Sequence, residues 1–171
     1  VGATAQAQIF TIGVGVGAVT PAAALHVAET ITTSPRGIMS SQHSTGVDGA
    51  RFHMRKSRGT NATPTVIVTG DVLGRLVASG YDGTAYLEMG AIDIVSSGTI
   101  GTNRVPTEMR FLVATDAAPS VLTQRMVINN TGNVGIGTTA PGCPLHVNKS
   151  KAGDALVRFD NTSVTGDGLY I

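Results

Sequence analysis

Apolar and polar residues alternate in short runs along most of this chain. The stretch from Glu108 to Thr115 sets Met109, Phe111 and Val113 against charged or small neighbours. Other strand-like runs extend from Ala50 to Lys56, Val66 to Val68, Leu73 to Ala78, Tyr86 to Val95 and Gln124 to Asn129. A period of two is typical of a half-buried strand, and no stretch shows the period of about 3.6 that indicates a helix. The pattern therefore predicts an all-β chain.

Turn residues separate these runs about every 8 to 12 positions, a spacing typical of antiparallel β-sandwich or β-prism modules. The strongest turn signal is Asp82-Gly83, which lies between Tyr81 and Tyr86. Asp-Gly between two extended runs predicts a tight β-hairpin. Gly70-Asp71 predicts a second turn in the same part of the chain.

A glycine-rich motif occurs twice. The first copy is Ile12-Gly13-Val14-Gly15-Val16-Gly17, followed by Leu25-His26-Val27, and the second is Asn133-Val134-Gly135-Ile136-Gly137, followed by Leu145-His146-Val147. The offset between matching positions is constant, since 135 − 15 = 120 and 145 − 25 = 120. An internal repeat predicts modular architecture. We therefore expect residues 1–27 to hold the end of a junction and the first repeat, 28–131 a sandwich-like module, and 132–171 the second repeat and the start of another module.

Glycine at alternate positions predicts strands with one bare face. In an extended strand, successive side chains point to opposite faces. A face without side chains lets another backbone approach closely. We expect this close approach, at a junction between modules, from Gly13, Gly15, Gly17, Gly135 and Gly137. The apolar residues Val14, Val16, Val134 and Ile136 should pack on the other face.

Composition narrows the function classes. Hydrophobic residues make up 42% of the chain but aromatic residues only 4%, and charged residues 13%. A net charge of +1 gives no electrostatic reason to expect a nucleic-acid partner. No apolar run reaches the roughly 18 residues that indicate a membrane-spanning helix, so we expect no membrane insertion. The single cysteine, Cys143, excludes an intrachain disulfide and a cysteine-based metal cluster.

Several motifs, taken together and in order, resemble the repeating module of bacteriophage tail fibres. They are Gly70 to Leu76, Gly80 to Tyr86, Met109-Arg110-Phe111, Gln124 to Ile128 and Gly132 to Pro141. The resemblance runs from about Arg51 to Val147. Modules of this kind often precede a self-cleaving intramolecular chaperone domain that enforces trimer assembly. Residues 1–171 depart from this pattern in containing no segment like the chaperone domain, and in having Pro119 to Gln124 where an acidic, more polar turn is common.

The resemblance implies a homotrimeric, elongated virion protein, assembled in the host cytoplasm, whose shaft supports host-cell attachment. Its partners would be further copies of itself and adjacent fibre or baseplate proteins, with bacterial surface polysaccharide as a further candidate. The glycines named above would lie at the trimer junction. The composition is compatible with this, because strands with few aromatic residues bury little alone and three copies could cover one another's edges.

Two further motifs are candidate ligand sites. Gly135 to Ala140 fits a nucleotide-binding fingerprint, but Pro141, Gly142 and Pro144 prevent the helix start that phosphate binding requires. No cofactor is therefore expected. His26 and His146 hold equivalent positions, and in a trimer each could form a ring of imidazoles for a transition metal. A strand histidine hydrogen-bonded to backbone is the interpretation we favour.

The alternative function is a carbohydrate-binding, lectin-like receptor-recognition domain, with a groove formed by Tyr81, Tyr86 and the loop from Ser96 to Pro106. An enzyme is not expected. The carboxylates of the central region are scattered singly, whereas a glycosidase needs two that face each other; they are Asp71, Asp82, Glu88, Asp93, Glu108 and Asp116. The basic cluster Arg51, Arg55, Lys56 and Arg58 is interpreted as a charged edge strand, with contact to anionic lipopolysaccharide as the alternative.

Overall fold

The computed structural model describes residues 14–16, 25–27, 38 and 40–149. The chain divides into two compact units, Val1–His53 and Met54–Ile171. All regular elements of the described residues are β-strands, which confirms the all-β prediction. Accordingly, these residues contain no helix that could cross a membrane.

In the first unit, two short strands pair in parallel. They are β1 (Val14–Val16) and β2 (Leu25–Val27), and Gly15 is the register partner of His26. Both strands coincide with the first copy of the glycine motif. Gly13 and Gly17 of this motif lie outside the described residues.

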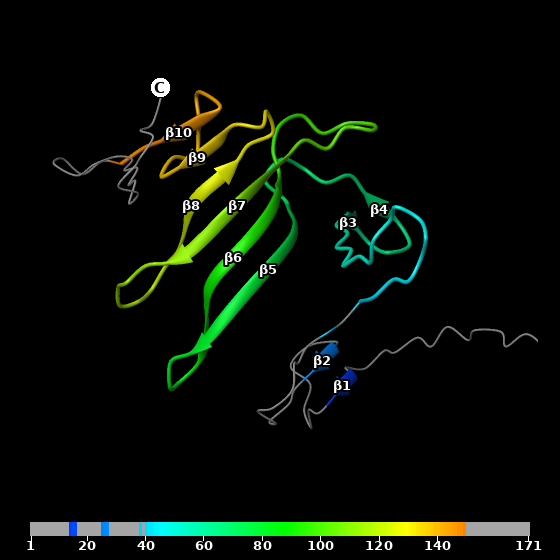
Figure 1. Ribbon diagram of the computed structural model, residues 1–171, viewed down its shortest axis with the longest axis horizontal. Coiled ribbons are helices and arrows are strands. Elements are labelled where there is room, and N and C mark those ends of the chain that lie inside the picture. Colours follow the sequence, from blue (N-terminus) through cyan, green and yellow to red (C-terminus); the bar gives the residue numbers. More distant parts are fainter. Residues whose placement is uncertain (1–13, 17–24, 28–37, 39, 150–171) are drawn as a thin grey trace, which may run out of the picture. The chain divides into compact units, whose positions relative to one another are not determined.

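The second unit contains a six-stranded sheet with the order β10-β9-β8-β7-β6-β5. Its strands are β5 (Val72–Tyr81), β6 (Tyr86–Ser96), β7 (Thr107–Ala114), β8 (Leu122–Ile128), β9 (Val134–Ile136) and β10 (Leu145–Val147). They lie side by side as one layer, from β5 in green to β10 in orange (Figure 1). Neighbouring strands are antiparallel from β5 to β9, and β10 joins β9 in parallel. The expected boundary between residues 131 and 132 therefore falls between two strands of one sheet.

The hairpin predicted at Asp82-Gly83 is present between β5 and β6. The Asp82 carboxylate accepts hydrogen bonds from the backbone N–H groups of Thr84 at 2.7 Å and Ala85 at 2.8 Å. Gly83 has a φ of 104°, which favours glycine over residues with a Cβ. Because Asp82 also donates its own N–H to the Ala85 carbonyl, the turn is closed by four consecutive residues.

Two expected strands are absent. Residues 51–57 form no strand, and the chain becomes regular only at β3 (Arg58–Gly59), which pairs with β4 (Pro64–Thr65). Residues 66–68 are also irregular. The N–H of Val68 bonds to the Asp71 carboxylate and its carbonyl accepts from Ser96, so neither group is available for a neighbouring strand.

The buried apolar core of the described residues is small. Val95 and Val127 have no exposed surface, and Ile67 and Ala91 are each 8% exposed. Within the described ranges, the only other strands of this unit are the two-residue strands β3 and β4, which form a separate small sheet. The described chain therefore supplies one full layer, and no second layer of comparable size lies within it.

Candidate functional site: the two faces of the sheet

The register of the six-stranded sheet gathers apolar residues on one face. Directly paired residues of neighbouring strands point to the same face of a sheet. Two such rows cross the sheet from β5 to β10, one of Leu76, Ile92, Phe111, Met126, Ile136 and Val147, the other of Gly74, Ile94, Met109, Ile128, Val134 and Leu145. Neither row contains a polar side chain. We call this surface the apolar face.

Much of the apolar face is open to solvent. Leu76 is 53% exposed, Ile136 43% and Leu145 61%. A shallow hollow of ≈ 430 Å³ is lined by residues of β5, β6 and β7, among them Leu76 and Phe111. Contiguous exposed apolar surface marks a binding or assembly site in soluble proteins. This face is the main candidate for a functional surface.

The opposite face carries charges that neutralise one another. Asp93, which is 3% exposed, lies on β6 directly opposite Arg75 of β5 and Arg110 of β7. Arg75 donates to Asp93 through Nε at 2.7 Å and Nη2 at 2.8 Å, and through Nη1 to Glu88 at 3.1 Å. Nε of Arg110 donates to Glu108 at 2.6 Å. Because the buried carboxylate has a bidentate arginine partner, this charged face is satisfied within the chain.

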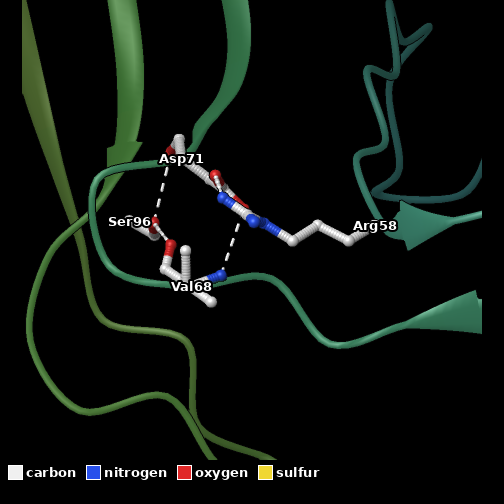
Figure 2. Close-up of polar contacts among 4 residues, drawn as sticks. All are labelled: Arg58, Val68, Asp71 and Ser96. Carbon is white, nitrogen blue, oxygen red and sulfur yellow. Dashed lines mark hydrogen bonds and ion pairs between the residues drawn. The ribbon is translucent and has the colours of Figure 1, made fainter.

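A second bidentate ion pair fastens the β3 segment to the end of the sheet (Figure 2). Arg58 of β3 donates through Nε to Asp71 Oδ2 at 2.8 Å and through Nη2 to Oδ1 at 2.7 Å. The N–H of Val68 donates to the same carboxylate at 3.0 Å. Ser96, at the end of β6, donates its N–H to the Asp71 carbonyl at 2.9 Å and its hydroxyl to the Val68 carbonyl at 2.7 Å.

These contacts change the acidity of two turn carboxyls. The hydrogen bonds from Arg58 and from the Val68 N–H hold the pKa of Asp71 well below its ordinary value. The same ion pair raises the pKa of Arg58. The backbone hydrogen bond from Ala85, with those from Thr84, lowers the pKa of Asp82 to about 2. Both carboxylates therefore serve to hold turns in place.

The glycines of the second motif are closely approached by other atoms of the same chain. A Cβ at Gly135 would lie 2.7 Å from the Thr138 carbonyl oxygen and 3.0 Å from Val127 Cγ1. Gly137 has a φ of 71°, and a Cβ there would overlap the Asn148 carbonyl oxygen. Their role at a trimer junction stays a prediction.

The apolar neighbours of these glycines belong to the apolar face. Val134 is half-buried, but Ile136 remains 43% exposed. In the first copy, Val14, Gly15 and Val16 form β1. Their packing lies outside what the structure describes, so their predicted role also stays a prediction.

His146 has a backbone partner, as the favoured interpretation expected. Its Nδ1 accepts a long hydrogen bond of 3.4 Å from the Gly142 N–H. In a neutral ring this leaves the proton on Nε2. The described residues contain no cluster of three or more His, Cys, Asp or Glu side chains that could hold a metal ion. The side chain of His26 lies outside the described residues.

The groove expected for a lectin-like domain does not form as predicted. Tyr81 and Tyr86 are paired at the hairpin, with ring centroids 5.2 Å apart, and both are exposed. The loop that begins at Ser96 follows the other end of β6. The tyrosine pair and this loop are therefore separated by the whole 11-residue strand. At about 3.3 Å per residue, the strand holds them roughly 30 Å apart.

Five of the six carboxylates named as candidates for catalysis have other partners. Asp71 pairs with Arg58, Asp93 and Glu88 with Arg75, Glu108 with Arg110, and Asp82 with its own turn. No two of these five carboxylates pair with each other. This arrangement is that of structural ion pairs.

Most of the basic cluster lies outside any strand, since only Arg58 belongs to one, β3. Arg58 pairs with Asp71, whereas Arg55 and Lys56 line a hollow of ≈ 300 Å³ together with Ser57, Asn61 and Pro64. Arg51 pairs with Asp48 at 3.2 Å on the surface.

Sequence reasoning did not predict the two arginine networks. Arg58 and Asp71 are 13 positions apart, and Arg75 and Asp93 are 18 apart. Neither spacing is a local signal. The alternation of Glu108 and Arg110 with apolar residues indicates a strand with one polar face, but the partners of these charges depend on strand register.

The comparisons with known proteins find similar solved structures but no matching sequence. No protein-family model matches the chain, and no curated protein sequence matches it. Among solved structures, the chain is similar to the carboxy-terminal domain of the bacteriophage T5 L-shaped tail fibre, at 16% identity and a TM-score of 0.46. The match covers 58% of this chain and 36% of that one, so the chain spans about a third of its length. The functional proposal therefore depends on the sequence repeat and the geometry of the sheet.

We predict that Gly135→Val lowers the free energy of unfolding by about 1–3 kcal/mol, the usual cost of overpacking. The valine side chain would collide with Thr138 and Val127. Gly142→Ala is the control, since no atom lies within 4 Å of a Cβ at that position. Urea unfolding of both variants measures the difference, and equal stability would contradict the close approach.

We predict that Arg75→Met destabilises the sheet by about 2–3 kcal/mol, because it leaves the buried Asp93 carboxylate without its partner. Arg125→Met, on the exposed part of β8, should change the stability by less than about 0.5 kcal/mol. Thermal and urea unfolding provide the comparison. Equal losses of stability in the two variants would show that the Arg75–Asp93 pair does not stabilise the sheet.

Acid should destabilise the protein through Asp71 and Asp82. Their pKa values are lowered on folding, so their stabilisation is complete above the ordinary carboxyl pKa of about 4 and is lost as the pH falls below it. We expect Asp71→Asn to lower Tm by several degrees at pH 7, and the difference from the parent chain to shrink towards pH 2. Asp48→Asn, at a surface pair, is the control. A difference that stays constant with pH would refute the assignment.

Proposed function

We propose that this chain is a structural shaft module of a bacteriophage tail fibre, or of a closely similar virion appendage, and works as a homotrimer that supports host-cell attachment. The observation that carries the proposal is the asymmetry of the sheet. One face is apolar and open, whereas the charges on the other face are satisfied within the chain.

A sheet with one apolar face needs a second layer to cover it. The described residues supply no such layer of comparable size, so the covering surface comes from outside the described part of the chain. Identical copies around an axis provide it economically, since each copy presents the same rows to the others. The number three comes from the resemblance of the sequence motifs to tail-fibre modules.

The mechanism is mechanical. Burial of the apolar faces against one another in a closed assembly would stiffen the sheets. The arginine–carboxylate pairs within each chain would hold its strands in register. The repeated glycine motif supports a spacer function, because spacers are built by repetition. Adjacent fibre or baseplate proteins would dock at the ends, and the assembled shaft would hold an adhesive tip away from the particle.

The arrangement supports a structural role over a catalytic one. Five of the carboxylates considered for catalysis are engaged with arginine or with their own turn. The alternative of a lectin-like domain has no observation that favours it, since its expected groove residues lie at opposite ends of β6.

We predict that Leu76→Glu abolishes trimer formation and leaves a folded monomer. Leu76 is 53% exposed on the apolar face, so a charge there is tolerated by a single chain but costly in a buried interface. Val77→Glu is a matched control, because Val77 is 46% exposed, follows Leu76 on β5 and points to the charged face. Light scattering gives the mass, and gel migration with and without heating in SDS gives the resistance of the assembly.

The expected masses are a trimer for the parent chain and for Val77→Glu, and a monomer for Leu76→Glu. A monomeric parent chain with a folded circular-dichroism spectrum would overturn the proposed assembly. Equal loss of assembly in both variants would show that the apolar face is not the interface.

A further inference from the structure

Two cations of the basic cluster have no carboxylate partner within the described part of the chain. Arg58 donates two hydrogen bonds to Asp71, and Figure 2 shows its side chain extended towards that carboxylate. Arg55 and Lys56 are exposed and form no ion pair with the described residues. The pKa of Asp71 is lowered chiefly by the hydrogen bonds from Arg58 and Val68, and the charge of Lys56 makes the smallest contribution. Arg55 and Lys56 therefore keep positive charges that no described side chain neutralises.

These two cations border the hollow of ≈ 300 Å³ beside the β3–β4 hairpin. Its other lining residues are Ser57, Asn61 and Pro64, so no acidic residue lines it. The Ser57 hydroxyl and the Asn61 amide are hydrogen-bond donors. The volume lies at the lower end of the range for small-ligand sites, about 300–1,000 Å³. The lining therefore combines two positive charges with neutral donors, which is the chemistry of an anion site.

The hairpin holds one side of the hollow in place. Gly59 of β3 is the register partner of Pro64 of β4. The turn between these strands contains Asn61, and it is closed by a hydrogen bond from the Thr63 N–H to Thr60 Oγ1 at 3.0 Å. The Thr60 N–H donates in return to the Thr63 carbonyl at 3.2 Å. Asn61 and Pro64 are thus fixed relative to β3.

The ion pair between Arg58 and Asp71 restrains the other side of the hollow. Arg58 directly follows the run Arg55-Lys56-Ser57 in the sequence. Its two hydrogen bonds to Asp71 are 2.8 and 2.7 Å long. Binding costs less free energy when the segment that contacts the ligand is already ordered. This anchor therefore favours binding even though the hollow is exposed.

We propose that this hollow binds a phosphate group, with Arg55 and Lys56 as the charged contacts and Ser57 and Asn61 as neutral donors. The planar guanidinium of arginine can donate two parallel hydrogen bonds to a phosphate, and lysine supplies a compact point charge. A phosphate ester offers three acceptor oxygens and carries a charge of about −1.5 to −2 at pH 7. That charge matches the two cations, whereas a carboxylate brings a single charge and two oxygens.

The phosphate could be free or part of a larger molecule such as a phosphorylated sugar. Both sources present the same group to Arg55 and Lys56, and a comparison of their affinities separates them. The hollow is lined by residues of one chain, so the inference goes beyond the proposed shaft role and does not depend on the homotrimer.

Isothermal titration calorimetry on the full chain tests the site, with inorganic phosphate and glucose 6-phosphate as probes and glucose as the uncharged control. The ionic strength is held constant with sodium chloride, because salt screens exposed charges. The variants are Arg55→Gln, Lys56→Gln and Asn61→Asp, each of which lowers the net charge by one. Arg125→Gln is the matched control, since it makes the same change of charge at an exposed position on β8. Circular dichroism checks that every variant is folded.

We expect the parent chain and Arg125→Gln to bind both phosphate probes with equal affinity. Arg55→Gln and Lys56→Gln should each weaken binding by about fivefold or more, since each removes a charge-assisted hydrogen bond from an exposed site. Asn61→Asp should abolish binding, because it places a negative charge in the hollow.

Absence of phosphate binding by the parent chain would overturn the site, and so would an equal loss in Arg125→Gln. Glucose that binds as tightly as glucose 6-phosphate would refute an anionic ligand. Tighter binding of glucose 6-phosphate than of inorganic phosphate would support the site and assign it to a phosphate carried by a sugar. Equal or weaker binding of glucose 6-phosphate would support a site for free phosphate.

Discussion

The buried carboxylate of Asp93 determines which side chains share a face of the sheet. An ionised carboxylate can be buried only beside a compensating partner, and Arg75 provides two charge-assisted hydrogen bonds. A shift of one residue in the pairing of β5 with β6 would turn every side chain of one strand to the other face. Such a slip would leave Asp93 on the apolar side without Arg75. The ion pair therefore fixes the register that lines up both apolar rows.

That register gives the sheet two different surfaces. The charged surface is complete within one chain, because Asp93, Glu88 and Glu108 each have an arginine partner. The apolar surface stays open, with Leu76 and Leu145 more than half exposed. Hydrophobic burial is non-directional and proportional to area, so a surface of this kind drives association rather than specific chemistry. This asymmetry is the physical basis of the proposed structural role.

Further contacts are made at an edge and at one end of the sheet. At one edge β10 follows β9 in parallel, and at one end of the sheet Arg58 and Asp71 tie the preceding segment to the turn before β5. The glycine motif recurs at β1, which pairs with β2 in parallel and in the same register.

The sequence alone determined the fold class, the hairpin at Asp82-Gly83 and the two glycine motifs, because periods, turn residues and repeats are local properties of the chain. It did not reveal the pairing of Arg58 with Asp71 or of Arg75 with Asp93, since those contacts depend on strand register over 13 and 18 positions. It also predicted strands at residues 50–56 and 66–68, which the structure does not form. At residues 66–68, hydrogen bonds of Val68 with Asp71 and Ser96 prevailed over the apolar pattern. Only the tertiary structure decided which apolar residues share one face, because that depends on how distant strands align.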